Sequence, residues 1–271
     1  MTEVKARLPD YAIHHPTAAA ANGTSIFLLH GAFGAKEYWR EQLRALTGAG
    51  YRVVSWDAPG YGLSALPAPL TIDHCAKVLA LLLAREGGAR NIVMGHSMGG
   101  MIAQQAWRHA RAHIHGYVLS ATSASFGSPD GEWQKSFVRE RVAPLDAGKT
   151  IPEYAPVMLR AMMASGANGP VVDLVIDTVS QMREETFRAA VAAIVGFEGR
   201  DLLPTFDIPV LCIAGALDAT APAAVMQKMA TKIAGAEFAV LTGLGHFGWA
   251  EDPPRFNEVV LEFLQRRLTN S

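Results

Sequence analysis

Residues 92–103, Ile-Val-Met-Gly-His-Ser-Met-Gly-Gly-Met-Ile-Ala, decide how the rest of the chain is organised. A short apolar run typical of a β-strand enters a G-x-S-x-G pentapeptide, and an apolar, alanine-containing run typical of a helix leaves it. The pattern predicts that Ser97 lies at a strand-to-helix turn. Such a turn strains the backbone of its central residue and brings neighbouring main chain close, which explains the small residues Gly95 and Gly99.

This position suits Ser97 to nucleophilic chemistry. Its hydroxyl would stand above the sheet at a helix N-terminus, where unpaired N–H groups and the helix dipole favour the negative charge of acyl transfer. The pentapeptide alone is a weak signal, because the same letters often mark an ordinary turn. A serine nucleophile of this kind also needs an acid and then a histidine, each just after a later strand.

Length and composition favour one domain with an insertion and a small-molecule substrate. The chain has 271 residues, half of them hydrophobic, and its formal net charge is −1. No Pro-, Ser- or Gly-rich linker separates two halves, and the core material is ample. A nearly neutral chain offers no electrostatic reason to bind nucleic acid or an anionic membrane. We expect neither partner, and expect a monomer or homodimer.

The two cysteines and the first residues point to the cytoplasm. Cys75 falls in a helical pattern and Cys212 in a strand pattern, which favours two buried thiols over a disulfide or a metal site. Residues 1–10 are charged and lack an apolar run, and the alanines at 18–21 are too few to span a bilayer. The expectation is a cytoplasmic protein with neither a secretory signal nor an anchor.

A glycine-rich turn follows the buried strand predicted at 25–29. It reads His30-Gly31-Ala32-Phe33-Gly34 and precedes a helix predicted at 37–46. Such a turn can aim the Ala32 N–H at the tip of the neighbouring strand, where in this architecture it pairs with the Met98 N–H as an oxyanion hole. Phe33 is a candidate for the substrate pocket. We interpret His30 as a structural hydrogen-bonding residue rather than a second base.

Strand and helix patterns then alternate, which predicts a parallel sheet with helices on both faces. The expected strands lie at 51–56, 91–94 and 116–120 and the expected helices at 71–85 and 98–109, while 4–8 and 11–14 are possible edge strands. Asp57 opens a Pro- and Gly-rich turn before the nucleophile, so we interpret it as a turn residue. The histidines at 109, 113 and 115 enter a strand at the edge opposite Ser97.

The alternation lapses between 122 and 203. Helix-like patterns there are broken by prolines and glycines, which predicts a helical lid over the strand tips that selects an apolar or mixed substrate of modest size. Met158 and Met162 are candidate pocket residues, because methionine adapts to irregular ligand shapes; packing between lid helices is the alternative. A carboxylate-bearing substrate would favour an arginine clamp, but no single one stands out among Arg139, Arg160 and Arg183.

The required acid and histidine follow the last two strands. A strand predicted at 208–214 leads into Gly215-Ala216-Leu217-Asp218, and one predicted at 237–241 leads into Gly243-Leu244-Gly245-His246. The other aspartates between Ser97 and His246 lie in the insertion or, as Asp207 does, before a strand. The order Ser97, Asp218, His246 is the order that this architecture requires. A helix predicted at 254–268 closes the domain.

With these features in place, the sequence resembles the α/β-hydrolase superfamily over essentially its whole length. The matching stretches are His30-Gly31, residues 57–64, residues 95–100, residues 215–218 and Gly245-His246. Within the superfamily the segment at 215–222 is most similar to small capped serine esterases and lactonases, including the 3-oxoadipate enol-lactonase-like branch. The resemblance implies a mostly parallel eight-stranded sheet, a core at 1–121 and 204–271, and a helical lid at 122–203.

The chemistry expected is acyl transfer without a metal or organic cofactor. His246 would take the proton of Ser97 and Asp218 would orient the imidazole, while the Ala32 and Met98 N–H groups stabilise the oxyanion. A small, largely apolar ester or lactone is the expected substrate. The same triad serves carbon–carbon bond hydrolases of ring-cleavage products, and the fold also hosts ligand receptors. Dehalogenase and epoxide hydrolase relatives are disfavoured, since they place an aspartate where Ser97 stands.

Overall fold

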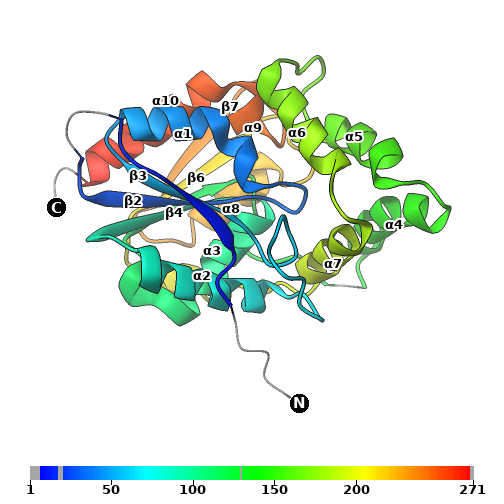
Figure 1. Ribbon diagram of the computed structural model, residues 1–271, viewed down its shortest axis with the longest axis horizontal. Helices are drawn as coiled ribbons and strands as arrows, with labels where there is room; N and C mark the ends of the chain where they lie inside the picture. Colours follow the sequence, from blue (N-terminus) through cyan, green and yellow to red (C-terminus); the bar gives the residue numbers. More distant parts are fainter. Residues whose placement is uncertain (1–6, 18–20, 129, 269–271) are drawn as a thin grey trace.

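The fold is built on one sheet, in which only the first strand is antiparallel (Figure 1). The computed structural model describes residues 7–17, 21–128 and 130–268. Across the sheet the order is β1-β3-β2-β4-β5-β6-β7. The strands are β1 (Asp10–His14), β2 (Thr24–Leu29), β3 (Arg52–Asp57), β4 (Arg90–His96), β5 (Gly116–Ser120), β6 (Val210–Gly215) and β7 (Glu237–Leu241).

Strand order creates the place for a site. β3 lies on one side of β2 and β4 on the other, so the chain changes its direction of travel across the sheet at β2. In open α/β sheets the ligand crevice forms at the carboxyl ends of the strands at such a point. The turn that starts at His30 follows β2, and Ser97 follows β4. Two turns far apart in sequence therefore meet.

Helices cover both faces of the sheet (Figure 1). α1 (Arg40–Gly48) and α10 (Pro253–Leu268) lie on one face, and α2 (Ile72–Glu86) and α3 (Met98–Ala110) on the other. The central strands are buried except at Arg90, the first residue of β4, as expected for a parallel sheet covered on both sides. The remaining core helices are α8 (Ala223–Ala230), the short α9 (Gly248–Glu251) and the 3₁₀ turns η1 (Lys36–Trp39), η2 (Arg111–His113) and η3 (Leu203–Thr205).

Four helices occupy the segment between β5 and β6, which we name the helical insertion (residues 122–203). Figure 1 shows them gathered on one side of the sheet. They are α4 (Glu132–Asp146), α5 (Ile151–Met162), α6 (Pro170–Ser180) and α7 (Glu184–Val195). α5 begins with a capping box, in which Thr150 and Glu153 satisfy each other's backbone N–H groups. The helical content of this segment was expected; its exact boundaries stay a prediction.

The fold class predicted from the sequence is confirmed, with one correction. The described residues form seven strands where eight were expected. The expected edge strand at 11–14 is β1, which pairs antiparallel with β3. Residues 4–6 of the other expected edge strand lie outside the described residues, and Arg7 and Leu8 are not in a strand. In the part of the chain that the structure describes, β1 is the strand at this edge of the sheet.

Two further expectations concern burial and membranes. Cys75 in α2 and Cys212 in β6 are both buried free thiols, as the patterns predicted, and burial raises the pKa of each to about 12. Such thiols are inert at neutral pH because the reactive species is the thiolate.

Among the described residues, none of the helices combines the length and the hydropathy that crossing a bilayer requires.

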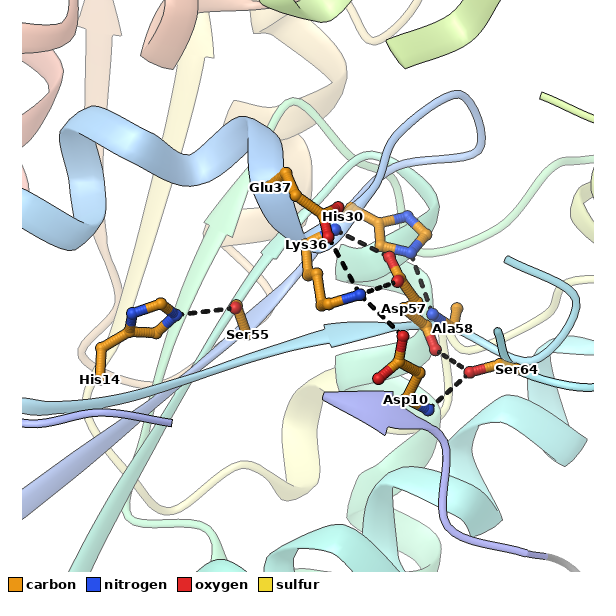
Figure 2. A network of polar contacts seen from close by, with 9 residues as sticks. All are labelled: Asp10, His14, His30, Lys36, Glu37, Ser55, Asp57, Ala58 and Ser64. Carbon is orange, nitrogen blue, oxygen red and sulfur yellow. Dashed lines mark hydrogen bonds and ion pairs between the residues drawn. The ribbon is translucent and has the colours of Figure 1, made fainter. Parts of the chain in front are cut away.

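A buried ionic network ties the sheet edge to the turn after β2 (Figure 2). The Asp57 carboxylate at the end of β3 is 1% exposed and accepts from the Lys36 backbone N–H at 2.9 Å and from Lys36 Nζ at 2.6 Å. Nζ also pairs with Asp10 of β1 and with Glu37. Burial by itself lowers the pKa of Lys36, but these hydrogen bonds outweigh it and raise that pKa. Asp57 therefore holds η1 and β1 against β3.

Asp57→Asn is expected to lower stability rather than catalysis. The change leaves Lys36 with Asp10 and Glu37 but removes its most buried partner, which should cost about 2 kcal/mol of unfolding free energy. Urea unfolding followed by fluorescence measures the loss, and Asp10→Asn, at the more exposed end of the network, should cost less. An unchanged unfolding midpoint in Asp57→Asn would show that the network does not stabilise the fold.

Candidate active site

Ser97 lies at the sharp turn predicted between β4 and α3. Its backbone has φ 52° and ψ −118°, in the left-handed region that a non-glycine residue seldom occupies. A Cβ on Gly95 would lie 2.4 Å from the Gly99 carbonyl oxygen, and a Cβ on Gly99 would lie 2.3 Å from the Leu29 carbonyl oxygen. Only glycine fits at both positions, because main chain approaches main chain there.

Hydrogen bonds hold this strained turn in place. The Ser97 N–H donates to the Ser120 carbonyl at the end of β5, at 2.9 Å. The Thr122 hydroxyl donates to the Ser97 carbonyl at 2.7 Å. Both backbone polar groups of Ser97 therefore have partners on the neighbouring strand and its extension. The Met98 N–H belongs to the first turn of α3, where backbone donors lack intrahelical acceptors.

His246 and Asp218 form a buried pair. Nδ1 of His246 lies 2.7 Å from Oδ2 of Asp218, and both side chains are buried. The other Asp218 oxygen, Oδ1, accepts from the Thr220 and Ala221 N–H groups at 2.8 and 2.9 Å. A carboxylate held in this way can only accept from the imidazole, so Nδ1 carries the hydrogen. Nε2 is then the nitrogen left to accept a proton.

The charge of Asp218 is preserved by its surroundings. Burial alone would raise the pKa of this carboxyl group, but the charge and hydrogen bond of His246 and the two backbone N–H donors outweigh burial and lower the pKa. Because the folded pKa lies below the unfolded value, the pair adds stability above roughly pH 4, which is lost as the pH falls further. Asp218 is therefore ionised wherever a neutral imidazole would be needed.

Side-chain hydrogen bonds hold the backbone of the turn after β2, and in one of them the Gly31 N–H donates to the Tyr38 hydroxyl at 2.8 Å. The Ala58 N–H donates to Nε2 of His30 at 3.0 Å, so Nδ1 carries the hydrogen and donates to the Gly31 carbonyl at 2.8 Å. The Tyr61 hydroxyl donates to the Ala32 carbonyl at 2.8 Å. Two successive peptide planes are thereby oriented. Because a trans peptide points its N–H opposite to its carbonyl, the His30 bond also sets the direction of the Ala32 N–H.

This turn lies directly beside the nucleophile turn. A Cβ on Gly31 would lie 3.2 Å from Cβ of Ser97. The expected oxyanion donors, the N–H groups of Ala32 and Met98, thus belong to two turns in contact. His30 is a structural hydrogen-bonding residue, as its sequence context suggested, and burial lowers its pKa and keeps the imidazole neutral. The sequence contained no signal for the tautomer.

A cavity of about 340 Å³ contains both Ser97 and His246. Three of its lining residues form an aromatic wall: Phe126, Trp133 and Phe137 have ring centroids 5.1 to 5.6 Å apart. Trp133 is 50% exposed at the rim. The remaining lining combines apolar side chains with hydroxyls from the segment after β5 and from the start of α8, among them Met101, Thr122, Ser123, Ser125, Ile194, Thr220 and Val225.

The pocket residues expected from the sequence lie elsewhere. Phe33 stacks on Phe187 of α7, with ring centroids 4.9 Å apart, and neither it nor Met158 or Met162 lines the cavity that holds Ser97. Met162 does reach the site, but through its carbonyl, which accepts from the His246 N–H at 2.9 Å. Residues of α4 line the cavity instead. No sequence motif indicates this, because the contacts of an amphipathic helix are set by tertiary packing.

The insertion's arginines are mostly engaged at the surface. Arg139 donates to Ser136, Arg160 lies 3.6 Å from Asp173, and Arg183 donates to the Gly60 carbonyl. None of the three lines the cavity. Arg141, which the sequence did not single out, is buried with its guanidinium carbon 3.6 Å from the centre of the Phe137 ring. It backs the aromatic wall from inside the insertion.

Within residues 7–17, 21–128 and 130–268, no three His, Cys, Asp or Glu side chains gather in a way that could hold a metal ion. The histidines expected to be remote from Ser97 are engaged elsewhere. His109 pairs with Asp73, and His115 Nδ1 accepts from the Asn91 N–H.

Family comparison agrees with this geometry. The model of the Alpha/beta hydrolase family matches residues 26–259, a span that contains Ser97, Asp218 and His246. The chain belongs to the alpha/beta hydrolase family. This confirms the resemblance that the order of the five sequence features predicted.

The relatives of this chain match it over nearly its whole length. RutD of Variovorax paradoxus, named as a provisional carbamate hydrolase, is 28% identical to this chain. The match covers 94% of this chain and 96% of the RutD chain. The 3-oxoadipate enol-lactonase 2 of Acinetobacter baylyi is 24% identical, with 95% and 94% covered. The enol-lactonase structure from Burkholderia xenovorans has a TM-score of 0.79 at 25% identity, covering 94% and 96%. This chain is a hydrolase of the same family.

Proposed function

We propose that this hydrolase cleaves a carboxylic ester or lactone through a Ser97 acyl-enzyme. The observation that carries the proposal is the buried hydrogen bond between Nδ1 of His246 and Oδ2 of Asp218. Asp218 holds Nδ1–H, and His246 lies in the same cavity as the strained Ser97. A serine hydroxyl is a poor nucleophile by itself, and a neutral imidazole with a free Nε2 is the base that activates it.

The reaction then proceeds in two matched halves. Ser97 Oγ attacks the carbonyl carbon as its proton passes to Nε2 of His246, and the oxyanion is stabilised by the Ala32 and Met98 N–H groups. The imidazolium returns the proton to the leaving alkoxide as the acyl-enzyme forms. Water repeats the sequence, giving its proton to His246 and its oxygen to the acyl carbon. Ser97 is regenerated, and an acid and an alcohol, or one hydroxy acid from a lactone, are released.

The cavity favours an apolar substrate of modest size. About 340 Å³ is at the small end of ligand pockets, and three aromatic rings face the nucleophile. Aromatic walls gain from offset or edge-on stacking beyond the area they bury. We therefore infer that the group attached to the ester carbonyl or oxygen is apolar and packs against Trp133 and Phe137, which line the cavity. Arg141, behind Phe137, lies outside this cavity.

An activity panel tests the proposal against its alternatives. Purified protein would be assayed on neutral monoesters, carboxylated monoesters, lactones and vinylogous diketones, with Ser97→Ala as the control. Ester or lactone turnover over many cycles, lost in the variant, is the expected result. Cleavage of the diketones alone would establish carbon–carbon bond hydrolysis. A single burst without turnover would make the protein a hydrolase-derived receptor and sink the proposal.

The pH dependence of kcat/KM should show one acid limb. An imidazole that is already protonated cannot accept the proton of Ser97, so the reaction needs the neutral form of its base. Because the pKa of Asp218 is lowered, that carboxylate stays ionised across the limb and does not contribute a second one. Initial rates on a neutral ester measure the profile. An identical limb in the slow residual turnover of His246→Gln would assign it to another group.

A further inference from the structure

The carboxylate of Glu251 accepts hydrogen bonds from the backbone of the loop that carries His246. Glu251 is the last residue of α9, five positions after the histidine. Its Oε2 accepts from the Gly245 N–H at 2.9 Å and its Oε1 accepts from the Phe247 N–H at 3.0 Å. These are the backbone donors immediately before and after His246. Within the described chain no Lys, Arg or His pairs with this carboxylate, so its charge is balanced by main-chain donors.

The same carboxylate reaches the helical insertion. Oε2 also accepts from the Ala164 N–H, at 2.9 Å, just beyond the end of α5. The N–H of His246 itself donates to the Met162 carbonyl, at 2.9 Å. All three consecutive donors of residues 245–247 are therefore engaged, two by Glu251 and one by the insertion.

Backbone packing closes this junction. A Cβ on Gly245 would lie 2.7 Å from the Ala164 nitrogen and equally close to the Met162 carbonyl oxygen. The end of α5 thus lies against the histidine loop without an intervening side chain. A Cβ on Gly215 would lie 2.1 Å from the Gly245 carbonyl oxygen. Gly215 starts the loop that carries Asp218, so this loop also contacts Gly245. The histidine loop is held between the insertion and the acid loop.

We propose that Glu251 is a positioning residue that couples the seating of the helical insertion to the placement of His246. The insertion forms the aromatic wall over Ser97, and its residues 162–164 share the Glu251 carboxylate with the histidine loop. Closing the pocket and assembling the base are then one event. The inference rests on the proposed function insofar as His246 is the base in that reaction.

The chemistry of a carboxylate explains why this position needs Glu. Two oxygens with several lone pairs accept from three N–H groups at once, and an ionised acceptor makes each bond stronger than a neutral one. In Glu251→Gln one oxygen becomes an NH₂ donor that faces an N–H. At least one of the three donors then loses its acceptor. A base displaced by about 1 Å can cost a hundredfold in rate.

The test compares Glu251→Gln with Glu251→Asp and with Glu258→Gln, a matched change on the exposed side of α10. On a neutral ester, Glu251→Gln should lower kcat roughly 10- to 100-fold while KM changes little, because the aromatic pocket is retained. Glu251→Asp should recover part of the rate, and Glu258→Gln should match the wild type. An unchanged kcat in Glu251→Gln would overturn the proposal.

A second variant separates coupling from local stability. Ala164→Pro replaces the insertion's N–H with a ring carbon, and Met163 before it is extended (φ −92°, ψ 165°), the conformation that a following proline requires. It should lower kcat, and amide hydrogen exchange at residues 245–247 should accelerate. Glu251→Gln should likewise accelerate exchange in both segments. Unchanged exchange at 245–247 in Ala164→Pro would overturn the coupling. This readout needs no substrate, so it stands apart from any failure of the proposed function.

Discussion

Ser97→Ala will abolish ester turnover and covalent labelling together. Without Oγ no acyl-enzyme forms, and loss of such a nucleophile lowers kcat on the order of 10⁶-fold in enzymes of this mechanism. A fluorophosphonate should add one adduct to the wild-type mass, on the peptide that contains Ser97. The strained turn at φ 52° is the reason for the expected selectivity, because it places Ser97 in the cavity that His246 also lines.

Ser123→Ala is the matched control, since Ser123 lines the same cavity but donates its hydroxyl to the Ser125 carbonyl. It should keep labelling at the wild-type rate. Labelling that survives unchanged in Ser97→Ala would show that another residue is the nucleophile.

Asp218→Asn will leave the fold intact and lower kcat about 10⁴-fold, the size of the effect where the same change was made in a serine protease triad. The remaining oxygen can still accept from Thr220 and Ala221. The amide that replaces Oδ2 would then donate toward Nδ1 of His246. That favours the tautomer with its hydrogen on Nε2, which cannot accept the Ser97 proton. Steady-state kinetics and circular dichroism measure the two halves of this expectation.

Two other aspartates test the choice of acid. Asp57→Asn should reduce stability, because that carboxylate is bound to Lys36 (Figure 2). Asp207→Asn should change little, because Asp207 pairs with Arg111 at the surface. If Asp57→Asn lost activity while Asp218→Asn kept full activity, the assignment of the acid to Asp218 would be wrong.

The sequence by itself determined the fold class and the order of the candidate triad. Those features are local: a strand, a tight turn rich in glycine and a helix occupy consecutive residues, so periodicity and turn chemistry reveal them. The family match over residues 26–259 confirms the class. The assignment of Ser97, Asp218 and His246 to catalysis stays a prediction, now supported by the Asp218–His246 bond and the shared cavity.

Only the tertiary structure decided which side chains surround Ser97. The sequence favoured Phe33, Met158 and Met162, whereas the cavity is lined from α4 by Trp133 and Phe137. No local pattern distinguishes these positions, because a helix of this insertion meets the core through contacts between residues far apart in the chain.

Hydrogen-bond roles were likewise settled by the fold. The tautomer of His30 follows from the hydrogen bond that the Ala58 N–H donates to its ring. The carboxylate of Glu251 accepts from the N–H of Ala164, which lies 87 positions earlier in the chain. A side chain's partner, and with it the atom that carries a proton, is fixed only when distant segments pack together. The candidate catalytic residues could therefore be predicted from consecutive stretches of the sequence, while the partners that hold them in place are visible only in the folded structure.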